Sequence, residues 1–185
     1  MPLTTLDPNS ALIVVDLQKG IASFPSVHPM ADVVTNASGL AAAFRRHDLP
    51  VVLVNVTGGA PGRAEQGYRG TFPADFADLL PELGRQPRDH VVTKQTWGAF
   101  TGTDLDAYLR EAGVTQVVLC GVATSIGVES TARYAHELGF NVTLAVDAMT
   151  DMDADAHANS LARIFPRLGE TGATQEIIDL LDQRG

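Results

Sequence analysis

The chain has 185 residues, 45% of them hydrophobic, which suits a single domain with a substantial core and excludes a disordered polypeptide. Its net charge of −9, from 13 Lys and Arg against 22 Asp and Glu, is scattered along the chain and argues against binding to nucleic acid or an anionic membrane. One cysteine, no apolar leader and no apolar run of membrane-spanning length indicate a cytoplasmic protein without disulfides.

Short apolar runs alternate with segments whose apolar residues recur at i, i+3 and i+4, the spacing of an amphipathic helix. In chain order the pattern predicts a strand at 11–15, a helix over 30–44, strands at 50–56 and 90–94, a helix over 105–112, a strand at 115–120, a helix over 124–138, a strand at 141–146, a helix over 154–165, a strand at 170–173 and a helix over 174–181. The strands lack polar alternation, which is typical of a parallel sheet buried on both faces. We therefore expect one α/β domain over residues 1–185, a three-layer doubly wound fold with a mainly parallel sheet of about six strands and helices on both faces.

Chemically interesting residues follow several of these strands. The carboxyl ends, where a doubly wound sheet usually holds its active site, are occupied by Asp16, Lys94, Gly121 and Asp147. A buried Lys94 would need a carboxylate partner, and Asp16 is the natural candidate, although an Asp at a strand end is often only a cap and a lone Lys is usually solvated. The one long irregular region, 57–73, is rich in glycine and has a length typical of a substrate lid.

The turn over residues 121–127 connects a strand to a helix. Backbone N–H groups at a helix start are unpaired and can stabilise negative charge, as in an oxyanion hole. The plainer interpretation is a tight turn in which Thr124 caps the helix.

Three motifs occur in a fixed order: Asp16 after the first strand, Lys94 before Trp97-Gly98-Ala99-Phe100, and Gly121-Val122-Ala123-Thr124 before Gly127-Val128. Together they resemble the isochorismatase-like hydrolase superfamily, and the resemblance extends from about residue 11 to about 181. It implies that Asp16 is the acid–base residue, that Lys94 is its electrostatic partner, and that Ala123 and Gly127 supply oxyanion-hole N–H groups. It also implies a non-proline cis peptide bond at Val122–Ala123, and a homodimer or homotetramer.

Gly127 departs from the cysteine hydrolases of this superfamily, in which the matching residue is the catalytic Cys. Covalent catalysis would need another nucleophile, and Cys120 and Ser125 are weak candidates because one ends an apolar strand and the other precedes the expected position. The stretch 55–59 also lacks the His of the metal-dependent nicotinamidases, and the five His residues are dispersed. We therefore expect no metal, no cofactor and no nicotinamidase activity.

True isochorismatases resemble this chain in carrying Gly at the Cys position, and they hydrolyse a vinyl ether. There the carboxyl group that matches Asp16 protonates the alkene carbon and water then adds; the chain differs from them in having Ala123 for Tyr and Ser125 for His. Three hypotheses stay open. The chain is a cysteine-free hydrolase with Asp16 as general acid or base, a catalytically inactive homologue that binds a small molecule, or an amide (C–N) hydrolase with another nucleophile.

Several side chains near these motifs are candidates for binding the small-molecule substrate: Gln18, Phe24, Arg69, Trp97, Phe100 and Thr124. The aromatic residues would wall an apolar pocket, although isolated aromatics are as often simple core, and an arginine in a loop is more often solvated.

Overall fold

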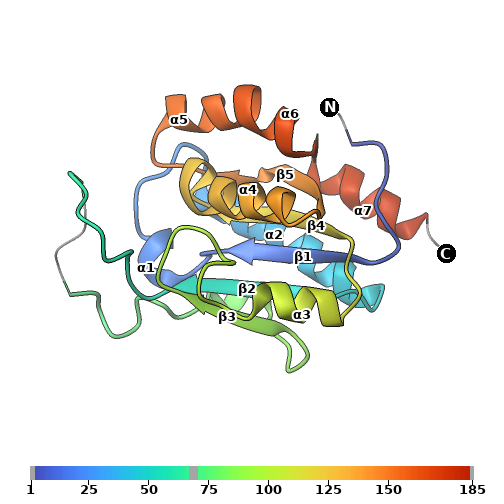
Figure 1. The fold of residues 1–185 in the computed structure, drawn as a ribbon, viewed down its shortest axis with the longest axis horizontal. Helices are drawn as coiled ribbons and strands as arrows, with labels where there is room; N and C mark the ends of the chain where they lie inside the picture. The colour runs from blue at the N-terminus through green and yellow to red at the C-terminus, as the bar shows by residue number, and fades with distance from the viewer. Residues whose placement is uncertain (1–2, 67–70, 184–185) are drawn as a thin grey trace.

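Six parallel strands form one sheet, in the order β3-β2-β1-β4-β5-β6, in a computed structural model that describes residues 3–66 and 71–183 (Figure 1). The strands are β1 (Ser10–Val15), β2 (Val51–Val56), β3 (His90–Lys94), β4 (Gln116–Val122), β5 (Asn141–Thr150) and β6 (Glu170–Gly172). The strand order reverses its direction between β1 and β4, which are paired at the centre of the sheet. The crevice beyond the carboxyl ends of two such strands is the usual ligand site of this kind of sheet.

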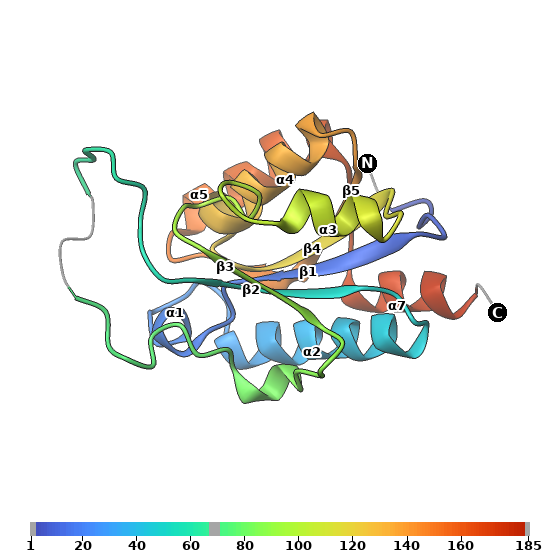
Figure 2. The same ribbon diagram turned by 60° about the horizontal axis from the view of Figure 1, so that its bottom comes forward.

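Helices cover both faces of the sheet (Figure 2). One face carries α1 (Lys19–Ala22), α2 (Met30–Arg46), the 3₁₀ turn Pro81–Leu83 and α7 (Thr174–Asp182), and the other carries α3 (Leu105–Glu111), α4 (Glu129–Glu137), α5 (Ala154–Asn159) and α6 (Phe165–Leu168). Successive residues of β1 point to opposite faces, so Leu12 packs in the core beneath α2 and Ile13 packs in the core beneath α3 and α4. The sheet is thus buried on both sides, and the predicted three-layer α/β fold is confirmed.

Two of the predicted helices are less regular than their sequences indicate. The helix expected over 124–138 begins with a π-helical turn, Thr124–Val128, before α4. The helix expected over 154–165 is α5, a second π-helical turn at Ser160–Ile164, and then α6. Apolar spacing does not separate α from π turns, because the two differ by one residue in the hydrogen-bond step.

Strand β5 is longer than predicted, and this corrects one candidate residue. The register between β4 and β5 shifts between Leu119 and Gly121, so β5 continues to Thr150 instead of ending near 146. Asp147 therefore lies inside β5, and its Oδ1 accepts hydrogen bonds from the backbone N–H and the hydroxyl of Thr174 (2.7 and 2.8 Å) at the start of α7. The prediction that Asp147 ends the strand was wrong.

Candidate active site

Asp16 follows β1 directly and is buried, with 5% of its surface exposed. Its backbone has a left-handed φ of 51°, and its N–H donates to the Val54 carbonyl at 3.0 Å. Oδ2 accepts a hydrogen bond from Lys94 Nζ at 2.7 Å, whereas Oδ1 has no hydrogen-bond partner among the described residues. A buried carboxyl oxygen without a protein partner is costly, and it marks a place where a ligand can complete the bonding.

Lys94 ends β3 and is almost wholly buried. Because β2 lies between β3 and β1, the Lys94 side chain reaches over the end of β2 to contact Asp16. Its ammonium group also donates to the Thr96 carbonyl at 3.1 Å. The predicted pairing of the two residues is confirmed.

Burial sets the acidity of the Asp16 carboxyl group. It raises the pKa of Asp16 from 3.8 to about 6, and the positive charge and hydrogen bond of Lys94 oppose this shift without cancelling it. Near neutral pH the carboxyl group is therefore partly protonated. An acid in this range can both give and take a proton during a reaction.

The turn after β4 brings a third backbone segment to the same site. The Val122–Ala123 peptide bond is cis, as the family resemblance predicts. The Ala123 carbonyl accepts hydrogen bonds from the N–H groups of Ile126 and Val128, both at 3.1 Å. These two bonds close the start of the π-helical turn Thr124–Val128.

The backbone around Gly121 and the space around Gly127 constrain these two positions differently. A Cβ atom on Gly127 would lie 3.2 Å from Asp16 Oδ2 and 3.0 Å from a Val15 methyl group, so a side chain here would face the acid after small shifts. Gly121 has a φ of 118°, and a Cβ on it would lie 2.0 Å from the Val15 carbonyl oxygen. The backbone requires glycine at 121, whereas a side chain at 127 would need the Val15 methyl group, Asp16 Oδ2 and the Val122 carbonyl oxygen (3.2 Å) to shift by a few tenths of an ångström.

Two residues that the sequence analysis missed hold the turn in place. Asp151, directly after β5 and buried, accepts the Ser125 backbone N–H at Oδ2 (2.7 Å). His157 Nδ1 lies 2.9 Å from the hydroxyl of the wholly buried Thr124, and burial together with His28 lowers the pKa of His157. Thr124 therefore does not cap the helix, and its hydroxyl is engaged by His157. The available signal for Asp151 was an acidic residue directly after the fifth strand. The sequence analysis ended that strand at residue 146 and therefore chose Asp147.

The alternative nucleophile Cys120 lies inside β4, away from any surface. Its side chain is fully buried in the core against α2, and burial raises the pKa of its thiol far above the usual range. A thiol that neither ionises nor meets substrate cannot attack it. Ser125 is tied to Asp151 through its backbone, as described above.

The predicted substrate contact Gln18 is engaged with the backbone of the fold. Its side-chain amide donates to the carbonyls of Val56 (3.0 Å) and Phe76 (2.9 Å), and its carbonyl accepts the N–H of Val56 (2.7 Å). The side chain is fully buried, and these bonds join the two ends of the glycine-rich region.

The three candidate aromatic residues do not form one enclosed wall. Phe100 belongs to the core and stacks on Phe140, with 6.2 Å between ring centroids. Phe24 and Trp97 are 45% and 65% exposed. Arg69 lies outside the described residues.

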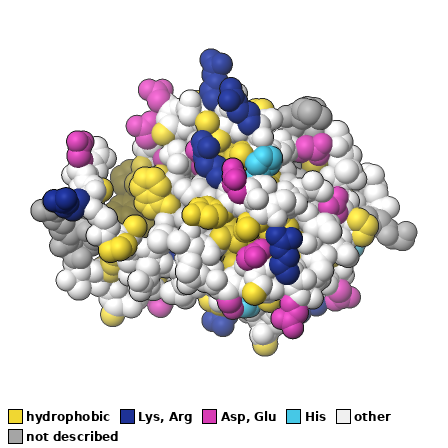
Figure 3. Space-filling model, in the orientation of Figure 1, with side chains coloured by type: hydrophobic (Ala, Val, Ile, Leu, Met, Phe, Trp, Pro, Cys, Tyr) yellow, Lys and Arg dark blue, Asp and Glu magenta, His cyan; other side chains and the backbone are white. Residues whose placement is uncertain are grey.

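Within residues 3–66 and 71–183, no group of three or more His, Cys, Asp and Glu side chains is arranged to hold a metal ion. No helix in that part of the chain combines the length and hydropathy needed to cross a bilayer. Charged side chains of both signs are interspersed over the described part of the face in Figure 3, as their scatter in the sequence predicts.

The chain is similar to known proteins over most of its length. The family model of the isochorismatase domain matches residues 10–176. The uncharacterised isochorismatase family protein YwoC of Bacillus subtilis is 43% identical over 92% of this chain and 93% of its own length. A ureidoacrylate amidohydrolase of Variovorax paradoxus is 32% identical over 84% of this chain and 74% of its own length. The solved structure of an isochorismatase family protein from Burkholderia thailandensis has a TM-score of 0.93 and 41% identity, covering 96% of this chain and 98% of that one.

Proposed function

Because the chain belongs to the isochorismatase family of hydrolases, we propose that it hydrolyses a small metabolite without a cysteine nucleophile, with Asp16 as general acid. The single observation that carries the proposal is the buried Oδ1 of Asp16, which has no partner among the described residues. Two further observations support it. No side chain at Gly127 can attack a substrate, and Cys120 is enclosed in the core.

An enol ether, the vinyl ether of an isochorismate-type substrate, suits such a site because its cleavage starts with a proton instead of a nucleophilic side chain. Asp16 gives its proton to the terminal alkene carbon, and the electron pair of the double bond forms the new C–H bond. Water adds to the resulting oxocarbenium carbon and returns a proton to the Asp16 carboxylate. The hemiketal then breaks its C–O bond, which yields a ketone and a free alcohol.

Lys94 and the turn have supporting roles in this scheme. The ammonium group, 2.7 Å from Oδ2, stabilises the carboxylate that forms when Asp16 loses its proton, and leaves Oδ1 as the oxygen that faces the substrate. The N–H groups of Ala123 and Gly127 would bind a negatively charged substituent of the alkene. General acid catalysis supplies about 10²–10⁴-fold, so the rest of the acceleration comes from binding and orientation.

Product analysis with isochorismate, simpler enol ethers and small amides tests the proposal. We expect Asp16→Asn to lower turnover of the active substrate at least about 100-fold. Asp106→Asn, which removes the exposed partner of Arg110, is the matched control and should keep full turnover. An Asp16→Asn protein with full activity would rule the mechanism out.

The pH dependence distinguishes an acid from a base. A general acid with a pKa of about 6 works in its protonated form, so kcat/KM should be constant at low pH and fall about tenfold per unit above pH 6. A rate that instead rises through pH 6 would assign Asp16 the role of general base.

The similarity to a ureidoacrylate amidohydrolase favours hydrolysis of a C–N bond as a second candidate. Gly127→Cys tests it, because the new Cβ would lie 3.2 Å from Asp16 Oδ2 and place a thiol beside the acid. Gain of amidase activity would show that the other parts of a cysteine-hydrolase site are complete. Ligand-induced thermal stabilisation with no product from any substrate would support the inactive binding homologue. A homodimer or homotetramer and a cytoplasmic location stay predictions.

A further inference from the structure

Two backbone segments from different parts of the chain approach the Asp16 carboxyl group. The segment after β3 carries the Lys94 ammonium group, 2.7 Å from Asp16 Oδ2. The turn after β4 brings Gly127, on which a Cβ atom would lie 3.2 Å from the same oxygen. Because β2 and β1 separate β3 from β4 in the sheet, no strand pairing joins the ends of β3 and β4 directly. Another contact must therefore set the position of one segment relative to the other.

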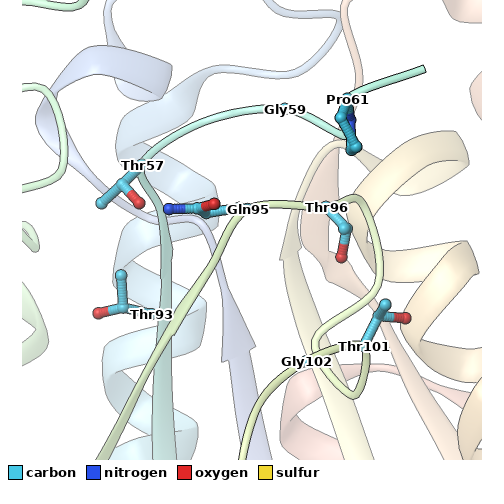
Figure 4. Close-up of a pocket in the computed structure, with 8 residues that line it drawn as sticks. All are labelled: Thr57, Gly59, Pro61, Thr93, Gln95, Thr96, Thr101 and Gly102. Atoms are coloured by element: carbon cyan, nitrogen blue, oxygen red, sulfur yellow. The ribbon is translucent and has the colours of Figure 1, made fainter.

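The place of the Lys94 ammonium group depends on the backbone just after it. This group donates to the Thr96 carbonyl at 3.1 Å, and the Thr96 hydroxyl donates to the Gly98 carbonyl at 3.1 Å. Figure 4 shows the segment turning at Thr96 and returning at Thr101, beside a hollow of about 360 Å³. The described lining of this hollow includes neither Lys94 nor Asp16. What fixes the ammonium group is thus the path of the segment and not the hollow.

Thr131, on α4, contacts both segments with one hydroxyl group. Its side chain is wholly buried, and its hydroxyl donates to the Gly127 carbonyl at 2.7 Å. The same oxygen accepts the backbone N–H of Ala99 at 3.1 Å. A hydroxyl has one proton to donate and lone pairs to accept with, so this single group satisfies a donor on one segment and an acceptor on the other.

The Gly98–Ala99 peptide group connects Thr131 with the lysine. Its carbonyl accepts the Thr96 hydroxyl, and its N–H donates to Thr131. The carbonyl of Thr96 in turn accepts the Lys94 ammonium group. Hydrogen bonds through one residue and one peptide group thus link the ammonium group to the turn after β4.

We infer that Thr131 is a positioning residue for the Asp16–Lys94 pair, because its hydroxyl fixes the segment after β3 against the turn after β4. Its importance for catalysis rests on the proposed function, whereas its effect on the pair does not. A threonine in a helix often donates only to the carbonyl four residues before it, as Thr35 on α2 does to Ala31 at 2.8 Å. Thr131 differs from that pattern in also accepting an N–H from a distant segment.

Loss of the Thr131 hydroxyl should change the acidity of Asp16. In Thr131→Val the wholly buried Ala99 loses the acceptor of its N–H, and an unpaired buried N–H is costly enough to move the segment. Lys94 is the charged group that lowers the pKa of Asp16, against the effect of burial. A looser contact with Lys94 therefore raises this pKa, and we expect the titration midpoint to rise by roughly half a pH unit or more.

Carbon-13 NMR of the aspartate carboxyl groups in the full-length protein measures this midpoint without a substrate. The Asp16 signal is the one that is missing from Asp16→Asn. Thr131→Ser keeps the hydroxyl and loses only a methyl group, so it should titrate as the wild type does. Thr35→Val, the matched control, removes the helical bond alone and should also leave the midpoint unchanged.

A second variant makes the test independent of how well Thr131→Val folds. Thr96→Val, at a half-buried position, removes the bond to the Gly98 carbonyl in the same path and should raise the Asp16 midpoint as well. Midpoints equal to that of the wild type in both valine variants would overturn the inference. So would an equal rise in Thr131→Val and Thr131→Ser, because the methyl group and not the hydroxyl would then be responsible.

Kinetics with an enol ether separate this inference from the proposed function. In Thr131→Val the fall of kcat/KM with pH should move upward together with the carboxyl midpoint. If the midpoint rises and no enol ether is cleaved by the wild type, the positioning role stands and the proposed reaction is wrong. If Asp16→Asn abolishes turnover while both valine variants keep the midpoint and the pH profile of the wild type, the reaction stands and the positioning role is wrong.

Discussion

Two buried ion pairs lie at opposite ends of strand β3, and they differ in how completely their oxygens are bonded. Asp89, just before β3, meets Arg45, whereas Lys94, at the end of β3, meets Asp16. Arg45 Nε and Nη2 donate to the two Asp89 oxygens at 3.1 and 2.7 Å, and the Gln86 N–H donates to the second oxygen at 2.7 Å. The first pair is therefore closed on itself.

The second pair is just as buried but is left incomplete. Side-chain exposure is 7% and 1% for Arg45 and Asp89, and 2% and 7% for Lys94 and Asp16. Yet Lys94 contacts one oxygen of Asp16, and the other oxygen has no partner in the described chain. Two equally buried pairs thus differ in bonding: one has both carboxylate oxygens bonded, and the other leaves one buried oxygen that the proposed function assigns to the substrate.

Breaking the closed pair should have the largest effect on stability. Asp89→Asn leaves the buried Arg45 guanidinium without a counter-charge, and we expect the free energy of unfolding to fall by about 3–5 kcal/mol. Denaturant unfolding measures this value. A loss below about 1 kcal/mol would contradict the structural role of the pair.

The open pair should make stability depend on pH. Folding raises the pKa of Asp16 from 3.8 to about 6, so the folded protein binds this proton more tightly than the unfolded chain. Stability is therefore lost as pH rises from about 4 through about 6, by about 3 kcal/mol relative to Asp16→Asn, and the loss is complete above that range. Unfolding curves of both proteins between pH 3 and 8 give the difference, and a difference that stays flat would contradict it.

A neutral buried group gives an intermediate case. Gln18→Met keeps the volume but removes the bonds to Val56 and Phe76, and should lower the free energy of unfolding by about 1–3 kcal/mol. Gln175→Met, at an exposed site on α7, is the matched control. Equal effects of the two substitutions would show that the Gln18 bonds add no stability.

The smallest effect should come from an exposed pair. Asp48 and Arg88 form a salt bridge of 2.9 Å with side chains 89% and 49% exposed. Asp48→Asn should change the free energy of unfolding by less than about 1 kcal/mol, because water screens the charges. The same denaturation assay measures it, and a change as large as that of Asp89→Asn would remove burial as the explanation of the contrast.

The arrangement of strands was predictable because burial on both faces leaves a continuous apolar run in the sequence. Val51–Val56 and Gln116–Val122 are such runs, and the helices between them follow from apolar spacing. The extension of β5 was not predictable. It depends on a register shift against β4, which is a property of two strands together and leaves no local signal.

The candidate site likewise has features that were predictable from the sequence and features that were not. The Asp16–Lys94 contact was predictable, since parallel strands bring their carboxyl ends to one edge of the sheet. The use of Gln18 was not, because its partners are backbone groups, which every residue carries. Asp151 was missed because the predicted fifth strand ended four residues too early. The hollow beside Thr96 depends on loop paths that composition does not encode.

The contrast between Gly121 and Gly127 has an evolutionary consequence. Any substitution at 121 would collide with the neighbouring strand, so selection for folding alone removes variants there. At position 127 a Cβ would meet a Val15 methyl group, Asp16 Oδ2 and the Val122 carbonyl oxygen at 3.0–3.2 Å, so a small side chain needs these neighbours to shift. Two of the four glycine codons differ from a cysteine codon by a single base. If the neighbours of position 127 can move by a few tenths of an ångström, one base change would place a thiol beside the carboxyl group that the proposed function uses as an acid.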